Sequence, residues 1–284
     1  MGLKSKLTNT IYSALDSIYR KIDSSHVRRT KNIKKIPDYA NRKGGKLSYS
    51  EWAHVIGIFQ TIIYQNLPIK KGNKILDIGC GTGLLAIACE PFIHDGIYTG
   101  LDVMKSDIDY CKNHYKEPFY HFIHFDVYNA TYAANQSTEK KKWPIEDECY
   151  DLVTALSVWT HLKEDDAIFY FKEISRVLKK QGKAIITFFV LDDAYQNTLQ
   201  KRENTTGRYH STNQQNWIFN KPAYNSTFCF TPAWAATPED AIGINIKGLE
   251  ILEQESELKR IYYYPGNWKE EPGIYFQDII IFEK

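Results

Sequence analysis

The segment ILDIGCGTG, residues 75–83, constrains the fold of this chain more than any other part of its sequence. An apolar run typical of a buried strand leads directly into Gly79, Gly81 and Gly83, and the helix-like run LLAIACE follows. Glycines at such a junction let the backbone turn tightly and approach a ligand closely, and the helix N-terminus favours anionic groups. A nicotinamide-binding fingerprint needs its third glycine one position later, where this chain has Leu84. The segment therefore predicts a strand–loop–helix cradle for a ligand of a different class.

From residue 72 onward, short apolar runs alternate with helical segments. The expected strands are 74–79, 97–102, 122–126, 150–156 and 183–191, and the expected helices between them are 84–90, 106–115 and 164–180. This alternation implies β–α–β units and a parallel sheet with helices on both faces. Two further apolar runs, 258–264 and 274–283, predict an antiparallel hairpin at the C-terminus. The sequence thus predicts an α/β, Rossmann-like fold with a mostly parallel sheet of seven strands and a helical extension at its N-terminus.

Composition divides the chain into four parts. These are a basic N-terminal helical arm (1–46), the Rossmann-like core (47–191), an insertion rich in Asn, Thr, Gln, Tyr and Trp that caps the substrate (192–240), and the last part of the core with the hairpin (241–284). A helix is expected from Ser48 to Leu67, with Ser50 as its N-cap. Thr237, followed by Pro238, predicts a helix start after the insertion.

The arm differs from the rest of the chain in charge. The whole chain carries a formal net charge of +2, but twelve basic and three acidic residues in 1–46 give the arm +9 and leave −7 for the remainder. Within the arm, an amphipathic helix over 7–23 is predicted by apolar residues at steps of three and four, namely Leu7, Ile11, Leu15, Ile18 and Ile22. The arm can be a solvated tail, a peripheral contact with an anionic membrane or lipid-linked glycan, or a docking element for a partner or homodimer.

Several function classes are excluded by composition. Hydrophobic residues at 43% and charged residues at 25% indicate a globular chain rather than a disordered one. Neither a signal sequence nor a membrane-spanning stretch is recognisable. The five cysteines are scattered without a CxxC pair, which predicts neither a disulfide framework nor a zinc site. The expectation is a reduced, cytoplasmic protein.

Acidic residues lie in or at the ends of the first three predicted strands in an ordered way. Asp77 lies two residues before the glycine loop, Asp102 ends the second strand, and Asp126-Val127 stand at the end of the third. A carboxylate at the end of the second strand can accept both ribose hydroxyls of a nucleoside. With the loop and the runs YDLVTALSVWTHL and RVLKKQGKAIITFF, this order resembles the class I S-adenosylmethionine-dependent methyltransferases over residues 45–284. The variants SVWTHL and ITFFVLDD look most like bacterial methyltransferases of cell-surface glycan gene clusters.

The resemblance implies S-adenosylmethionine as cofactor and S-adenosylhomocysteine as product. The residues that it implies for cofactor binding are Asp77, Gly79, Cys80, Gly81, Gly83, Leu84, Asp102, Val103, Asp126, Val127 and Ser157. Within this set, Leu84 and Val103 are expected to pack against the adenosine, and Cys80 to contribute its backbone. Asp77 can equally cap the loop by accepting backbone N–H groups.

Methyl transfer from a sulfonium is an in-line displacement, so the protein mainly supplies alignment and excludes water. A hydroxyl acceptor must also lose its proton, usually to a positioned histidine or carboxylate. His161, after the fourth strand, is the candidate base, and the alternative is a histidine that packs or caps a helix. Asp192, with Asp193, is the rival base at the end of the fifth strand. This pair could hold Mg²⁺, but a metal is not favoured, and no metal ligands are predicted.

The insertion contributes aromatic side chains that suit a sugar ring. They are Tyr195, Trp217, Phe219, Tyr224, Phe228 and Trp234, with His210 among them. The alternative is that half of them pack the insertion onto the sheet. Tyr49 is a candidate to close over the cofactor. The leading hypothesis is O-methylation of a sugar hydroxyl on a glycan or glycan precursor.

Three alternatives to that hypothesis stay open. The first is a small-molecule N- or O-methyltransferase of secondary metabolism. The second is an RNA methyltransferase whose basic arm binds phosphates, but the net negative charge of the body and the lack of an NPPY-type tetrapeptide disfavour nucleic acid as a partner. The third is a non-catalytic protein that binds only the cofactor.

Overall fold

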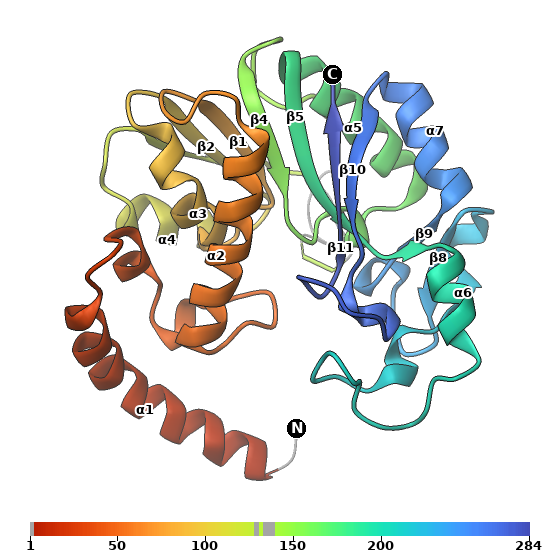
Figure 1. The fold of residues 1–284 in the computed structure, drawn as a ribbon, viewed down its shortest axis with the longest axis horizontal. Helices are drawn as coiled ribbons and strands as arrows, with labels where there is room; N and C mark the ends of the chain where they lie inside the picture. The colour runs from red at the N-terminus through yellow and green to blue at the C-terminus, as the bar shows by residue number, and fades with distance from the viewer. Residues whose placement is uncertain (1–2, 128–130, 133–139) are drawn as a thin grey trace.

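A computed structural model describes residues 3–127, 131–132 and 140–284. Within these residues, seven strands form one sheet in the order β10-β11-β5-β4-β1-β2-β3 (Figure 1). Its strands are β1 (Lys74–Ile78), β2 (Ile97–Asp102), β3 (Tyr120–His124), β4 (Tyr150–Ala155), β5 (Leu178–Phe188), β10 (Lys259–Tyr264) and β11 (Asp278–Glu283). The pairs among β1 to β5 are parallel, and β11 is antiparallel to both of its neighbours. The predicted Rossmann-like sheet with an antiparallel C-terminal hairpin is confirmed.

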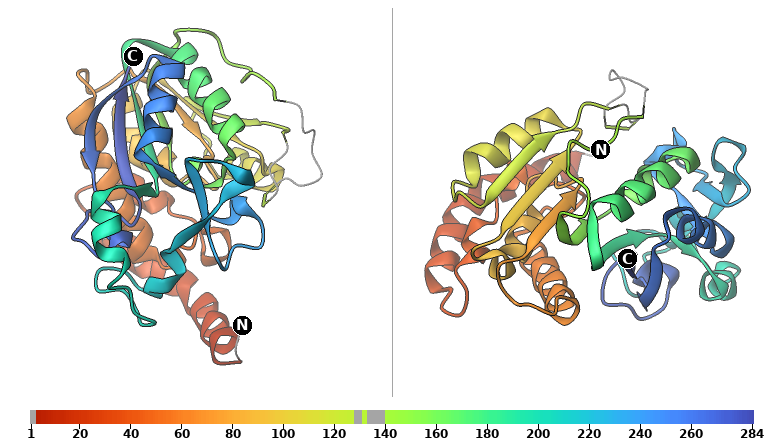
Figure 2. Two further views of the ribbon diagram at one scale, coloured as in Figure 1. Left: turned by 90° about the vertical axis from the view of Figure 1, so that its right-hand side faces the viewer. Right: turned by 90° about the horizontal axis from the view of Figure 1, so that it is seen from above.

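Helices cover both faces of this sheet (Figure 2). They are α2 (Tyr49–Asn66), α3 (Leu84–Ile93) and α4 (Lys105–His114) on one face, and α5 (Glu164–Val177) and α7 (Ile246–Ser256) on the other. Successive side chains of a strand point to opposite faces, so Ile279 and Ile281 enter the first core while Ile280 and Phe282 enter the second. Among the described helices, none is long and apolar enough to cross a membrane.

The end of one helix and the cap of another differ from their predictions. Helix α5 ends at Val177 instead of residue 180, because Leu178 is fully buried and pairs with Tyr150 of β4. The sheet therefore begins before the predicted residue 183, through an irregular stretch in which Gln181 has a φ of 63°. Helix α2 is capped by Ser48 instead of Ser50, since Ser48 has the extended backbone of a cap and its Oγ accepts from Glu51 N at 3.0 Å.

The insertion builds a second sheet. Its strands are β6 (Val190–Leu191), β7 (Phe219–Pro222), β8 (Cys229–Pro232) and β9 (Gly243–Asn245), in the order β6-β9-β8-β7. Helix α6 (Asp193–Leu199) and several short 3-10 helices connect them, namely η4 (Gln214–Trp217), η5 (Ala223–Asn225) and η6 (Pro238–Asp240). Thr237 caps η6, as the sequence predicts. We call residues 189–245 the cap.

The N-terminal arm packs on the core through the segment that follows its first helix. Helix α1 (Leu3–His26) extends beyond the predicted 7–23, and η1 (Asn32–Lys35) and η2 (Tyr39–Asn41) follow. Asp16 of α1 accepts two hydrogen bonds from the buried guanidinium of Arg42, at 2.8 and 3.0 Å. Asn32 donates to the carbonyl oxygen of Ile87 in α3 at 2.8 Å. The Asp16–Arg42 pair thus holds α1 on the rest of the arm, and the buried Asn32 hydrogen bond joins the arm to the core.

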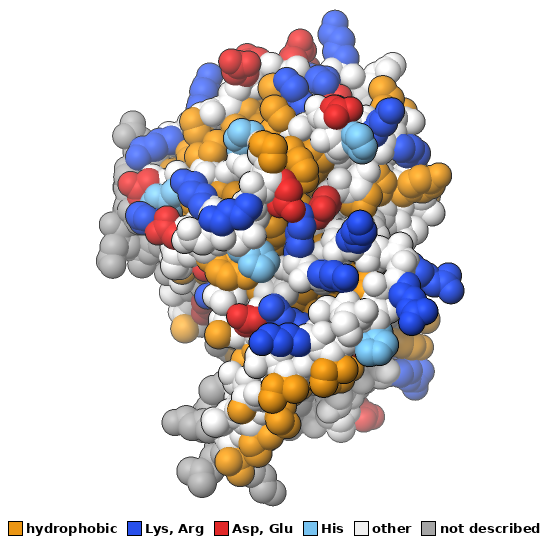
Figure 3. All heavy atoms as spheres, turned by 90° about the vertical axis from the view of Figure 1, so that its left-hand side faces the viewer, with side chains coloured by type: hydrophobic (Ala, Val, Ile, Leu, Met, Phe, Trp, Pro, Cys, Tyr) orange, Lys and Arg blue, Asp and Glu red, His pale blue; other side chains and the backbone are white. Residues whose placement is uncertain are grey.

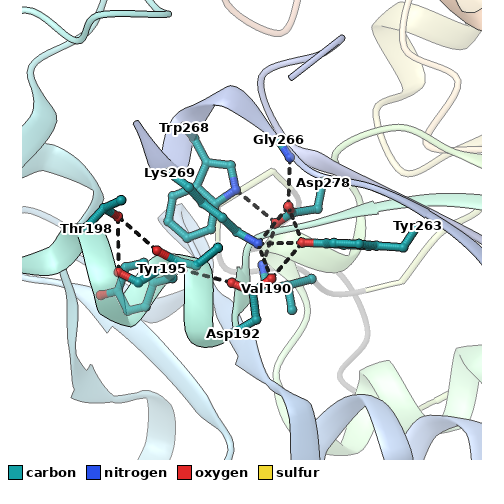
Figure 4. A network of polar contacts seen from close by, with 10 residues as sticks. Val190, Asp192, Tyr195, Thr198, Tyr263, Gly266, Trp268, Lys269 and Asp278 are labelled. Atoms are coloured by element: carbon teal, nitrogen blue, oxygen red, sulfur yellow. Dashed lines mark hydrogen bonds and ion pairs between the residues drawn. The ribbon is translucent and has the colours of Figure 1, made fainter. Parts of the chain in front are cut away.

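A buried ion-pair network joins the cap to the terminal hairpin (Figure 4). The side chain of Lys269, in η7 (Asn267–Lys269), is fully buried, and its ammonium lies 2.7 Å from Asp192 and 2.9 Å from Asp278. Asp192 also caps α6 by accepting from Tyr195 N at 3.0 Å. Burial opposes ionisation of Asp192, but Lys269 and the hydrogen bonds outweigh it and hold the pKa of this carboxyl below its usual value. Asp192 therefore has a structural position, which differs from its expected role as a rival base.

Replacing Lys269 by methionine should lower the free energy of unfolding by about 3–5 kcal/mol, because the buried carboxylate of Asp278 and the partly buried one of Asp192 lose their counter-charge. Urea unfolding followed by tryptophan fluorescence measures this loss. Lys105→Met is the matched control, since it removes an exposed ion pair with Asp109 and should barely change the unfolding midpoint. Equal midpoints for the two variants would refute a stabilising role of the network.

Candidate active site

The glycine loop after β1 has the backbone that the sequence predicts. Gly79, Gly81 and Gly83 have φ values of 66°, 51° and 92°, in the left-handed region that favours glycine. A Cβ on Gly79 would lie 2.5 Å from a methyl group of Val158, whereas a Cβ on Gly81 would meet no atom within 4 Å. Gly81 therefore borders open space, while Gly79 is required by close packing.

That open space is a cavity of about 390 Å³, which we call the loop cavity. Of the residues predicted to bind the cofactor, its lining includes Gly79, Gly81, Asp102, Val103, Val127 and Ser157. Its apolar wall includes Phe125, Trp143 and Leu162, and Lys43 and Gly44 reach it from the arm. Segments far apart in the sequence therefore share one cavity at the carboxyl ends of β1, β2 and β4.

Asp102 holds the loop in place. One of its carboxylate oxygens accepts from Gly81 N at 2.7 Å, and the other accepts from Met104 N at 2.8 Å. Burial raises the pKa of this carboxyl, and the two backbone hydrogen bonds oppose the rise. Each carboxylate oxygen has a second lone pair. Asp102 can thus accept two hydroxyl groups of a ligand in the loop cavity while it supports the loop.

Four predicted cofactor residues in or beside the loop lie outside the described lining of the cavity. Asp77 is buried and accepts from the hydroxyl of Tyr98 at 2.5 Å and from Thr154 at 2.8 Å. Burial raises its pKa to about 7, against the effect of these hydrogen bonds. The others are Cys80, Gly83 and Leu84. Both of the hydrogen bonds to Asp77 come from hydroxyl groups of the neighbouring strands β2 and β4, so among the described contacts the Asp77 carboxylate joins strands beneath the loop instead of accepting from the backbone N–H groups of the loop.

Asp126 also lies outside the described lining. Its side chain is exposed, while its neighbours Phe125 and Val127 face the loop cavity. Trp143 also lines the loop cavity, and its ring stacks on Tyr170 with centroids 5.7 Å apart. Sequence reasoning missed Trp143, because it lies in a stretch without periodicity between β3 and β4. No signal short of the fold could have identified it.

His161 lies where the loop cavity meets a second one. It ends the 3-10 helix η3 (Trp159–His161), and its Nδ1 lies 2.6 Å from the carbonyl oxygen of Glu239 in η6. A carbonyl only accepts, so Nδ1 carries the proton and Nε2 is the basic nitrogen of the neutral ring. Burial lowers the pKa of His161, against the hydrogen bond to Glu239 and the charge of Asp240. The ring is therefore held neutral in one tautomer.

The second cavity, which we call the cap cavity, measures about 470 Å³ and lies between α2, the cap and the terminal hairpin. It shares Gly44, Ser157 and His161 with the loop cavity. Ser157 has a φ of 61°, uncommon outside glycine, and its Oγ accepts from Gln277 at 2.9 Å. The cap cavity is further lined by Phe189, Trp217, Tyr275, Phe276, Tyr209, His54, His210 and Asn267. The two cavities together offer a cofactor-sized and an acceptor-sized space with His161 at their junction.

The aromatic residues of the insertion divide between packing and the cap cavity. Tyr195, Phe219 and Phe228 are buried, and Tyr224 and Trp234 are exposed outside the described lining of either cavity. Trp217 and His210 line the cap cavity, and His210 pairs with Glu270 at 2.7 Å. Tyr49 is buried in the core of the sheet, not over a cavity. Three of the seven predicted residues are thus buried in packing, and two line the cap cavity.

The described residues contain no cluster of three His, Cys, Asp or Glu side chains that could hold a metal ion. Asp192 is paired with Lys269, and it lies outside the described lining of both cavities. Nothing in the geometry therefore brings the Asp192–Asp193 pair to an acceptor.

Comparisons with known proteins agree with this geometry. Residues 76–186 match the family model described as a methyltransferase domain. A ubiquinone biosynthesis O-methyltransferase of Pelagibacter ubique is 33% identical over 113 residues, which cover 39% of this chain and 40% of that protein. A sterol 24-C-methyltransferase of Schizosaccharomyces pombe is 25% identical over 159 residues, 53% of this chain and 36% of that protein. The chain thus spans well under half the length of these curated relatives.

Solved structures show the same fold. An S-adenosylmethionine-dependent methyltransferase of Leishmania major superposes with a TM-score of 0.53 and 14% identity over 89% of this chain and 82% of that one. A protein of Pyrococcus horikoshii superposes with a TM-score of 0.53 and 17% identity, over 90% of this chain and 99% of that one. The resemblance to enzymes of glycan gene clusters stays a prediction. The matched segment, its loop and its sheet show that residues 76–186 belong to the class I S-adenosylmethionine-dependent methyltransferase family.

Proposed function

We propose that this chain transfers a methyl group from S-adenosylmethionine to a hydroxyl group of an acceptor bound in the cap cavity, with His161 as the general base. The observation that carries the proposal is the position of His161 at the junction of the two cavities, with its Nδ1 held by the Glu239 carbonyl. An activated donor needs little more than alignment, but a hydroxyl acceptor needs a base.

The residues of the loop cavity fit the cofactor. Asp102 would accept the ribose hydroxyls, the space beside Gly81 would admit the ligand close to the backbone, and Trp143 with its apolar neighbours would enclose the adenine. When bound, S-adenosylmethionine supplies a methyl group on a positively charged sulfur. Lys43 and Gly44 of the arm lie at the same cavity and would help to exclude water.

His161 would take the proton of the attacking hydroxyl on its Nε2. Because its pKa is lowered, the ring stays neutral at lower pH than an ordinary histidine does. The neutral ring is ready to accept a proton. The carbonyl of Glu239 would then stabilise the charged ring, because its hydrogen bond from Nδ1 strengthens when the imidazole is positive. Tyr132, whose ring lies edge-on to the imidazole at 5.1 Å, limits how far the ring can turn.

The acceptor proposed is a sugar hydroxyl on a glycan or glycan precursor. Aromatic side chains such as Trp217 and Tyr275, beside the amides of Asn267 and Gln277, support it, because such a lining offers flat apolar faces and hydrogen-bond partners. The relatives named as O-methyltransferases of ubiquinone biosynthesis also support a hydroxyl acceptor, and make that pathway's acceptors the rival class. The family match ends at residue 186, before the cap, so it does not decide between them.

Asp102→Asn should weaken binding of S-adenosylhomocysteine about tenfold or more, because hydrogen bonds to a carboxylate contribute about 1.5–3 kcal/mol. Thermal shift and titration calorimetry measure this. S-adenosylhomocysteine, but not NAD, should raise the melting temperature of the unaltered protein. Asp126→Asn, at an exposed carboxylate, is the matched control and should bind normally. Equal losses in both variants would contradict the assignment to Asp102, and no shift of the unaltered protein at millimolar ligand would contradict the cofactor.

His161→Ala should bind S-adenosylhomocysteine normally but turn over about 10²–10⁴-fold more slowly. In the unaltered protein, protonation of His161 should reduce turnover only as the pH falls below roughly 6.5, and this loss should be absent from the variant's pH profile. His121→Ala, at an exposed histidine of β3, serves as the control with normal turnover. Full turnover by His161→Ala would rule out the base role.

Transfer of label from radiolabelled S-adenosylmethionine to a panel of sugars, ubiquinone-type phenols and amines tests the acceptor class. With the accepted compound, Trp217→Ala should raise KM by about tenfold or more, since an aromatic stacking face is lost from the cap cavity. Trp234→Ala, at a half-exposed tryptophan outside the lining, is the control. Transfer to amines alone would overturn the hydroxyl proposal.

A further inference from the structure

We propose that helix α1 binds the surface of an anionic lipid membrane. The inference concerns an interaction surface and does not depend on the proposed methyl transfer. It rests on the exposed apolar face of α1, on how the opposite face is anchored, and on the charge of the arm.

The apolar face of α1 is exposed to solvent. Its five aliphatic residues are between 52% and 63% exposed, namely Leu7, Ile11, Leu15, Ile18 and Ile22, and Tyr12 and Tyr19 lie beside them. Figure 3 shows these side chains as a row of hydrophobic atoms along the helix that projects from the lower edge of the molecule. Monomeric proteins rarely expose a contiguous apolar patch of this kind unless it contacts a partner or a membrane.

The polar face of α1 holds the helix in this orientation. Asp16 is buried against the guanidinium of Arg42, with both side chains almost fully enclosed. One turn further along, Arg20 pairs with Asp38 at 2.9 Å. Both partners belong to the segment that follows α1 in the arm, and Asn32 joins this segment to α3, so the polar side of the helix faces the segment and the apolar side is presented outward. The exposed face is thus part of the folded architecture.

The positive charge of the arm indicates which partner binds the apolar face of α1. Arg28, Arg29, Lys31 and Lys34 follow α1 and are exposed, and the arm as a whole carries +9. Anionic lipid headgroups attract such a segment, and an apolar helix face with flanking Lys and Arg is typical of helices that lie in the membrane interface. Pairing of α1 with α1 of a second copy would bring two arms of +9 together, which like-charge repulsion disfavours. A membrane therefore fits better than a dimer.

Arg42, which holds α1, is also close in sequence to the loop cavity. Arg42, which binds Asp16, is followed directly by Lys43 and Gly44 of the loop cavity lining. Figure 1 shows α1 and the cap at the same end of the sheet, the end at which β4 and β5 finish. A membrane bound by α1 would thus lie on the side of the molecule that carries both cavities.

Co-sedimentation of the full chain with lipid vesicles tests the proposal. The protein should bind vesicles of phosphatidylcholine mixed with phosphatidylglycerol, bind phosphatidylcholine alone weakly, and lose affinity as salt is raised. The double variant Leu15→Gln, Ile18→Gln should bind the mixed vesicles about tenfold or more weakly, because two exposed side chains lose their apolar contact. Glutamine keeps the helix propensity of these positions.

Ile69→Gln combined with Ile261→Gln is the matched control, because both residues are exposed on the body and should leave vesicle binding unchanged. Normal thermal unfolding of each variant establishes that it is folded. Equal vesicle binding by the two double variants would overturn the proposal, as would no binding to mixed vesicles at low salt. A dimer in sedimentation velocity that only the α1 variant loses, without vesicle binding, would identify a second copy as the occupant.

Discussion

The order of the strands reverses between β1 and β4, and the site depends on the crevice that this reversal opens at the carboxyl ends of the strands. The connections after β1 and β4 run to opposite faces of the sheet, so their backbones diverge and leave space between them. The two connections are still in contact at Gly79 and Val158. At Gly81 they have separated. The Asp102 carboxylate then holds the loop open by binding Gly81 N.

The cap positions the candidate base at the site. β5 runs through Phe189 directly into β6, so the second sheet is continuous with the first. The Lys269 ammonium, between Asp192 and Asp278, fastens the start of the cap to the terminal hairpin. Because η6 belongs to this fastened unit, the Glu239 carbonyl reaches the ring of His161. The tautomer of the candidate base thus depends on a segment 78 residues further along the chain.

The local sequence pattern was sufficient to predict the sheet, its helices and the glycine loop. Burial of one face of a strand or helix makes apolar residues recur with a short period in the sequence. The same reasoning predicted Asp102 at the end of the second strand and His161 after the fourth, where they line the loop cavity. It could not separate Asp102 from Asp77 and Asp126, since all three are acids near the end of a strand. Their roles differ through neighbours distant in sequence, such as the Tyr98 hydroxyl beneath Asp77. Trp143 was missed because it lies in an aperiodic segment.

The sequence by itself determined the class of fold, the loop at its centre and the family of residues 76–186, since these depend on local backbone preference and on the periodicity of apolar residues. Tertiary structure decided which side chains face the cavities. It turned Asp192 into the partner of a buried lysine, buried the aromatic residues Tyr195, Phe219 and Phe228, and left the apolar face of α1 in solvent. These outcomes depend on contacts between segments far apart in the chain, which no local pattern encodes.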